Sequence, residues 1–233
     1  MSDLNEETCI KFFGDWDHPT AKKFDVWTAF FRSIGMDFKL PDSIRYMEGM
    51  SGKKYRYLIN NLIESVEDAR YLEIGSWAGS TACSAMYGNK CKVTCIDNWS
   101  EFGGPKEAFV HNTTAACSTD IDFTLIESDF RSVDYTAIGK YNVYMFDGPH
   151  LETDQYDGVV IAQPALDDAY LLVVDDYNGP AMQDGTARAI EDLNLNVIAS
   201  LEITTRNDGH GAKVGFQNSD WHNGYFFAVV TKG

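Results

Sequence analysis

Acidic residues follow two apolar runs at a spacing that suits metal binding. Phe146–His150 reads FDGPH after one run, and Val174–Asn178 reads VDDYN after another. If the two runs are neighbouring parallel strands, about 4.8 Å apart, Asp147, Asp175 and Asp176 converge at one edge of the sheet. Neither motif contains Lys or Arg, so a hard divalent cation such as Mg²⁺, Mn²⁺ or Ca²⁺ would relieve their repulsion. The alternative is that each acid caps a loop and faces water separately.

A glycine-containing turn indicates a nucleoside site. Tyr71–Thr81 reads YLEIGSWAGST, a strand that ends at Gly75 and turns into a helix, with Gly79 four residues later. Glycine at such a turn lets the backbone approach a ligand closely. Asp97 ends the next strand, where an acid accepts hydrogen bonds from a ribose diol. Because the third glycine of a dinucleotide motif and a P-loop are absent, the pattern favours S-adenosylmethionine over a phosphate-bearing cofactor.

Strands and helices must alternate to bring these motifs together. The sequence predicts an α/β fold, a doubly wound, Rossmann-like, seven-stranded, mostly parallel sheet with helices on both faces. The expected strands are ARYLEIG, CKVTCID, IDFTLIESD, NVYMFDG, AYLLVVDD, NVIASLEITT and GYFFAVVTKG, and the expected helices after the first strand lie at 79–88, 104–117, 131–138, 152–167 and 186–194. Helical spacing at 22–35 and in YRYLINNLIESVEDA predicts two earlier helices. We therefore expect a small N-terminal helical cap at 1–54 and the main domain at 55–233.

Over residues 55–233 the order of these motifs resembles class I S-adenosylmethionine-dependent methyltransferases. The resemblance rests on E-x-G-x-x-x-G, on the acid that ends the second strand, and on Ser128-Asp129 after the third. It implies that Glu73 lies near the amino end of the cofactor, and that Asp129 and Phe130 lie near the adenine. The full set of cofactor residues that it implies is Glu73, Gly75, Ser76, Gly79, Ser80, Asp97, Asn98, Trp99, Asp129, Phe130 and Asp147. The alternatives are a surface acid at Glu73 and a helix cap at Asp129.

The pattern D-G-x-H followed by V-D-D-Y is similar to metal-dependent O-methyltransferases of macrolide and aminocoumarin sugars, and more distantly to catechol O-methyltransferase. This resemblance implies that Asp147, Asp175 and Asp176 hold Mg²⁺ and that His150 is the general base, so that His150 and Asp147 are the catalytic pair. Catechol-type relatives place a lysine shortly after the first metal Asp, where this chain has Leu151 and Glu152. The implied activity is O-methylation of a small hydroxylated acceptor, a sugar or diol. The alternative for His150 is a packing or capping residue.

Two loops are candidates for the acceptor pocket. Trp99, Phe102, Gly103 and Gly104 follow Asp97, where they would cover the adenine or form a lid, unless they pack as an ordinary loop. Residues 206–225 include His210, Trp221 and His222 and would line the pocket, unless they form an exposed hairpin. The N-terminal cap is the other segment expected to shape the acceptor side.

The amino-acid composition limits the kinds of partner that the chain is expected to bind. The 233 residues have a formal net charge of −16, which disfavours nucleic acid and anionic membrane. Five cysteines, an odd number, and the lack of a signal-like or membrane-spanning apolar run predict a cytoplasmic location. The sequence leaves open a homo-oligomer. It also leaves open a metal-independent methyltransferase, a hydroxylase-associated relative, and a non-catalytic binding or assembly protein on the same scaffold.

Overall fold

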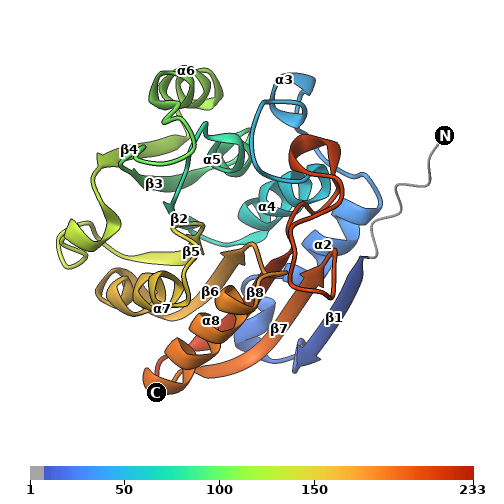
Figure 1. Cartoon of the computed structure of the whole chain (residues 1–233), viewed down its shortest axis with the longest axis vertical. Helices are drawn as coiled ribbons and strands as arrows, with labels where there is room; N and C mark the ends of the chain where they lie inside the picture. The colour runs from blue at the N-terminus through green and yellow to red at the C-terminus, as the bar shows by residue number, and fades with distance from the viewer. Residues whose placement is uncertain (1–7) are drawn as a thin grey trace.

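Eight strands form one sheet in the computed structural model, which describes residues 8–233. In chain order the strands are β1 (Cys9–Gly14), β2 (Arg70–Ile74), β3 (Cys91–Asp97), β4 (Ile121–Glu127), β5 (Tyr141–Phe146), β6 (Leu166–Asp175), β7 (Asn196–Thr204) and β8 (Tyr225–Thr231). Their order in the sheet is β1-β7-β8-β6-β5-β2-β3-β4 (Figure 1). The strands from β6 to β4 pair in parallel, whereas β8 is antiparallel to β6 and β7, and β1 is antiparallel to β7.

The α/β fold is confirmed, but the predicted sheet of seven mostly parallel strands is wrong, because the sheet has eight strands of mixed orientation. All seven predicted strands are present, and the missed one is β1. It pairs with β7 in a register that runs from Cys9 opposite Thr204 to Gly14 opposite Ala199. A six-residue edge strand has little periodicity of its own, and its partner residues lie 185 to 195 positions later in the chain, from Gly14–Ala199 to Cys9–Thr204. The segment expected to be a helical cap therefore also contains a strand of the sheet.

Helices cover both faces of the sheet. They are α1 (Pro19–Lys22), α2 (Val26–Ile34), α3 (Asp42–Arg45), α4 (Lys53–Ser65), α5 (Ser80–Met86), α6 (Lys106–Ala116), α7 (Glu152–Ile161) and α8 (Pro180–Asp192), with 3₁₀ turns η1 (Phe130–Ser132), η2 (Gln163–Ala165) and η3 (Phe216–Asn218). Figure 1 shows α4 and α5 on one side of the sheet and α7 and α8 on the other. Within residues 8–233, no helix is both long enough and apolar enough to cross a membrane.

The helix predicted at 131–138 is wrong. Only η1 forms there, and the chain then turns at Asp134, whose Oδ1 accepts hydrogen bonds from the backbone N–H and the hydroxyl of Thr136. Such local side-chain bonds compete with the helical hydrogen-bond pattern.

Alternation along β2 divides the core into two layers. Tyr71 packs with residues of α4 and α5, whereas Leu72 and Ile74 pack with residues of α7 and α8. Successive side chains of a strand point to opposite faces, so each buried strand supplies both layers. The inner parallel strands β2 and β5 are therefore buried on both faces, whereas the edge strand β4 is partly exposed.

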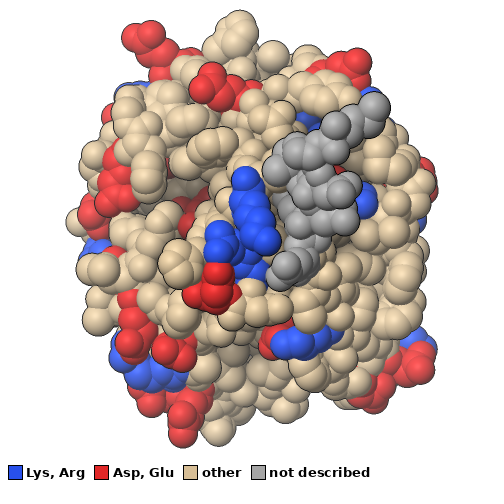
Figure 2. Space-filling model, turned by 45° about the vertical axis from the view of Figure 1, so that its right-hand side comes forward, with Lys and Arg blue, Asp and Glu red and all other residues tan. Residues whose placement is uncertain are grey.

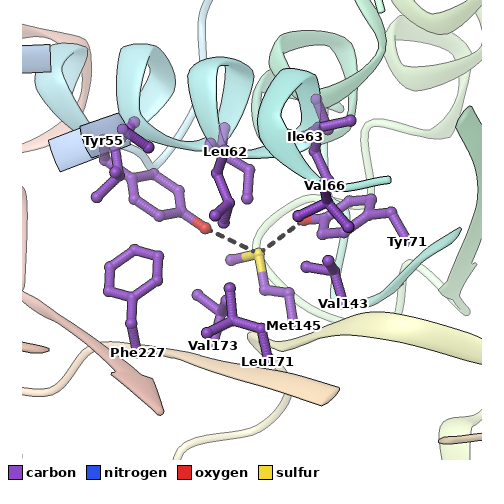
Figure 3. Packing of buried hydrophobic residues seen from close by; sticks show 14 of the residues in the cluster. Tyr55, Leu62, Ile63, Val66, Tyr71, Val143, Met145, Leu171, Val173 and Phe227 are labelled. Atoms are coloured by element: carbon purple, nitrogen blue, oxygen red, sulfur yellow. Dashed lines mark hydrogen bonds between the residues drawn. The ribbon is translucent and has the colours of Figure 1, made fainter. Parts of the chain in front are cut away.

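A buried polar group lies between β2 and α4. The hydroxyl of Tyr71 donates to Glu73 Oε2 at 2.6 Å. The hydroxyls of Tyr71 and Tyr55 lie 3.1 and 3.0 Å from Met145 Sδ (Figure 3). Glu73 is 1% exposed, and its Oε1 has no hydrogen-bond partner among the described residues. Burial raises the pKa of Glu73 to about 7, although the hydrogen bond from Tyr71 opposes this rise.

The variant Glu73→Gln should lose a pH dependence of stability. Because the pKa of Glu73 is about 7 in the folded chain and ordinarily 4.5, the unfolded chain releases this proton first. The free energy of unfolding therefore falls by up to about 3 kcal/mol between pH 4.5 and 7, and the amide removes this fall. Denaturant unfolding across pH 4.5–8 measures it, with Glu107→Gln on exposed α6 as control. Parallel stability curves for wild type and Glu73→Gln would contradict the prediction.

Candidate active site

A cavity of about 540 Å³ opens at the carboxyl ends of the parallel strands. It is lined by the turns that follow β2, β3, β4, β5 and β6 and by part of the segment between β7 and β8. From β2 the chain proceeds to β3 and β4 on one side, whereas β5 and β6 lie on the other side of β2. The cavity therefore lies where the strand order reverses, which is where doubly wound sheets bind ligands, and its volume suits a small molecule.

Gly75 brings the turns after β2 and β5 into contact. Its φ is +84°, and a Cβ at this position would lie 1.7 Å from the carbonyl oxygen of Asp147. The backbone N–H of Asp147 in turn donates to the carbonyl of Ile74 at 2.9 Å. Only glycine combines this backbone conformation with this close approach.

Asp97 joins two loops at the cavity wall. Its Oδ2 accepts a hydrogen bond from the backbone N–H of Trp77 at 2.8 Å, and its Oδ1 accepts one from the backbone N–H of Trp99 at 2.7 Å. The Trp99 indole donates to the carbonyl of Trp77 at 2.9 Å. Because a carboxylate has further lone pairs, Asp97 keeps acceptor capacity toward a ribose diol in the cavity.

The structure divides the predicted cofactor residues into two groups. Those that line the cavity are Gly75, Asp97, Asn98, Trp99, Asp129, Phe130 and Asp147. Those that lie outside its lining are Glu73, Ser76, Gly79 and Ser80. Ser80 Oγ lies 2.9 Å from Ser51 Oγ, and Asp129 caps η1 by accepting from the backbone N–H of Arg131 at 2.8 Å while it also faces the cavity.

The residues behind Gly75 fit a cofactor with a polar end. Glu73 Oε1 and Ser76 Oγ are buried on either side of Gly75 in the sequence and have no hydrogen-bond partner within the described chain. Buried polar atoms without partners are costly, so a ligand amino group that reached them would be stabilised. Together with the Gly75 turn and Asp97, these atoms suit S-adenosylmethionine.

Asp147, His150 and Asp176 form a compact cluster in the cavity. Each offers one ligand atom, and the three atoms lie within 4.8 Å of one another. His150 Nε2 is 2.9 Å from Asp176 Oδ2 and 3.9 Å from Asp147 Oδ1. Asp175, predicted as a third metal ligand, is not in this cluster: it is 3% exposed, and its Oδ1 accepts the backbone N–H of Asp176 at 2.7 Å. The two carboxylates offer oxygen donors that fit a hard divalent cation.

The cluster has strongly shifted pKa values. Burial, with repulsion from Asp176, raises the pKa of Asp147 to about 6, and burial raises the pKa of Asp175 well above its usual value. The carboxylates of Asp147 and Asp176 raise the pKa of His150 to about 10. Without a cation, His150 is therefore protonated at neutral pH and offsets the acidic charge.

Asn223 is a site residue that the sequence did not reveal. Its Nδ2 donates to Asp176 Oδ1 at 2.7 Å, and its own Oδ1 accepts the backbone N–H of Ala212 at 2.7 Å. Asn223 thus fixes the orientation of Asp176 from the segment before β8. An asparagine among Asn, Asp and Gly residues gives no signal of a partner 47 positions earlier.

The segment 206–225 contributes to the cavity only in part. Phe216, His222 and Asn223 line it, whereas Trp221 is buried in the core and stacks on Phe30 with ring centroids 5.8 Å apart. His210 is exposed and is not part of the lining. Met50 also lines the cavity, so the N-terminal segment contributes as well.

The loop after β3 lies at the opening. Phe102 lines the cavity and is 58% exposed, and its ring centroid lies 6.0 Å from that of His150. Gly104 meets the carbonyl of Trp99 so closely that a Cβ would lie 2.6 Å from it, whereas Gly103 faces open space. The loop therefore places an aromatic side chain next to the cluster.

Comparison with known proteins identifies the fold. Residues 72–177 match the family model described as "Methyltransferase domain". The chain is similar to a Podospora anserina methyltransferase bound to S-adenosylhomocysteine (TM-score 0.54, 14% identity, covering 89% of this chain and 87% of the other). It is also similar to a Bacillus cereus O-methyltransferase with S-adenosylhomocysteine (TM-score 0.50, 11% identity, 93% and 94%).

A third structure, TrmN from Thermus thermophilus, matches with a TM-score of 0.50 and 14% identity over 76% of this chain, which spans about half (49%) of that protein. A comparison with curated protein sequences gives no match. The sequence resemblance is thus confirmed: residues 72–177 match the model of a methyltransferase domain, and the chain shares its fold with S-adenosylhomocysteine-bound methyltransferases.

Proposed function

We propose that this chain is an O-methyltransferase that transfers the methyl group of S-adenosylmethionine, with Mg²⁺, to a small hydroxylated acceptor such as a sugar or diol. One observation above all supports this: the cavity wall that carries Gly75 and Asp97 continues into the cluster of Asp147, His150 and Asp176. A cofactor site and an ion site that share one cavity are the arrangement that metal-assisted methyl transfer requires.

The side chains of the cluster have distinct roles in this reaction. Bound S-adenosylmethionine supplies the methyl group, and a bound divalent cation supplies positive charge that lowers the pKa of the acceptor hydroxyl. Asp147 and Asp176 would hold the cation. Asn223 orients the Asp176 side chain by donating to it. Asp175 orients the backbone of Asp176 by accepting its N–H. His150 removes the hydroxyl proton at a ring nitrogen. Because Asp147 and Asp176 both face His150, positive charge held by these two carboxylates would favour the neutral imidazole that this role needs.

The variant Asp97→Ala should bind S-adenosylhomocysteine about 10- to 150-fold more weakly, since it removes charge-assisted hydrogen bonds worth about 1.5–3 kcal/mol. Calorimetric titration measures the affinity, and Asp122→Ala on exposed β4 is the matched control. Thermal unfolding of both variants checks that the Trp77 and Trp99 loops stay folded. An unchanged affinity in folded Asp97→Ala would remove Asp97 from the cofactor site.

Metal binding should depend on the two cluster acids. Asp176→Asn should weaken Mn²⁺ binding at least tenfold, because it removes an ionised ligand, while S-adenosylhomocysteine still binds. Electron paramagnetic resonance of free Mn²⁺ measures the affinity, with Asp184→Asn on exposed α8 as control. EDTA should in addition abolish methyl transfer. Full activity after exhaustive chelation would refute the metal-dependent mechanism.

The variant His150→Ala should retain cofactor and Mn²⁺ binding and lose about 10²–10⁴-fold in the chemical step, the usual contribution of a general base. Single-turnover rates with an acceptor that the wild type methylates isolate this step from product release. The rate that remains in this variant should lack the pH dependence that titration of His150 gives the wild type. Wild-type single-turnover kinetics in His150→Ala would leave this residue with a structural role.

A further inference from the structure

We propose that the cavity selects acceptors that are uncharged or positively charged and excludes those that carry a carboxylate or phosphate. The inference rests on the proposed function and adds the charge class of the acceptor. It derives from the charges that line the cavity and from the two aromatic side chains at its mouth.

The lining of the cavity is acidic. Its ionisable acids come from the ends of four strands, β3, β4, β5 and β6, and are Asp97, Glu101, Asp129, Asp147, Asp175 and Asp176. No Lys or Arg is among the described residues that line it, and residues 1–7, outside the described part, contain neither. A divalent cation would offset the charges of Asp147 and Asp176, which would hold it, so Asp97, Glu101 and Asp129 keep the lining negative with the ion bound. Low-dielectric walls strengthen the repulsion of a further anion in such a cleft.

Basic residues near the cavity are engaged elsewhere. Lys106 pairs with Glu127 at 2.5 Å, and Arg131, next to Asp129 in the turn, pairs with Asp154 at 2.6 Å and Asp157 at 2.9 Å. On the face shown in Figure 2, Lys and Arg side chains occur in small groups with Asp or Glu beside them. An anionic acceptor would therefore leave water for a site in which no described Lys or Arg side chain lines the cavity and the cation would already be paired with Asp147 and Asp176.

Two exposed aromatic side chains flank the cluster. Phe102 is 58% exposed and faces the His150 ring, while Phe216 is 49% exposed and stacks on His222 with ring centroids 5.5 Å apart. Both phenylalanines have positive φ, +49° and +58°, which is uncommon for aromatic residues. Apolar rings beside a polar cluster suit an acceptor that presents a ring face to them and its hydroxyls to the cluster.

A set of three diols that differ only in charge tests the proposal. The probes are 3,4-dihydroxybenzoate, 3,4-dihydroxybenzamide and 3,4-dihydroxybenzylamine, titrated by calorimetry at pH 7 and low salt into protein saturated with S-adenosylhomocysteine and Mg²⁺. We expect the amide and the amine to bind at least tenfold more tightly than the benzoate. We expect this preference to shrink as salt is added, because screening weakens charge repulsion.

Reversing one charge in the lining of the cavity tests the proposal in a second way. Glu101→Lys should narrow the preference against the benzoate by threefold or more, whereas Glu107→Lys, the same change on exposed α6 outside this cavity, should leave it unchanged. If the wild type binds the benzoate as tightly as the amide, or binds none of the three probes, the inference is overturned while the proposed function stands. Failure of the wild type to bind S-adenosylhomocysteine would instead overturn the proposed function, and the inference with it.

Discussion

The contact between Gly75 and the carbonyl of Asp147 determines where the site lies. A left-handed glycine at the end of β2 lets the turn after β5 approach within a distance that any side chain would block. The loop that begins with Gly75 and the loop that carries Asp147 and His150 therefore form one wall. Without this approach, a cofactor held by the first loop and an ion held by the second would lie in separate hollows, and positioning could not accelerate transfer between them.

The acidic side chains that meet at this wall repel one another, and neighbouring groups in the cavity reduce this repulsion. Burial disfavours the ionised form of Asp147, and His150 holds a proton because two carboxylates face it. Asn223 stabilises Asp176 with a neutral donor, which adds no charge to the cavity. The same negative charge would favour a cation in the cluster and disfavour an anion as acceptor, so the proposed metal binding and the proposed acceptor selection would have one physical origin.

The sequence predicted the features that depend on the pattern of residues within a short segment. The strand ends at Gly75, Asp97 and Asp147 could be located because apolar runs stop there, and parallel neighbours must bring such ends together. The sequence did not predict contacts between residues that are far apart in the chain. β1 pairs with β7 near the end of the chain, and Asn223 contacts Asp176 only in the folded structure. The VDD motif also depends on the fold, because β6 ends at Asp175 and Asp176 follows it with a φ of +55°. Only the second of them, Asp176, joins the cluster.

The central claim is that cofactor and cation occupy one cavity, and nuclear relaxation measures this directly. S-adenosylmethionine labelled with ¹³C at its sulfonium methyl would be bound to the protein, and Mn²⁺ added. We expect strong paramagnetic relaxation of the methyl carbon, which weakens when Asp147→Asn and Asp176→Asn together remove the ionised cluster acids. Bound cofactor and bound Mn²⁺ with no relaxation of the methyl carbon would place the ion elsewhere and contradict the account.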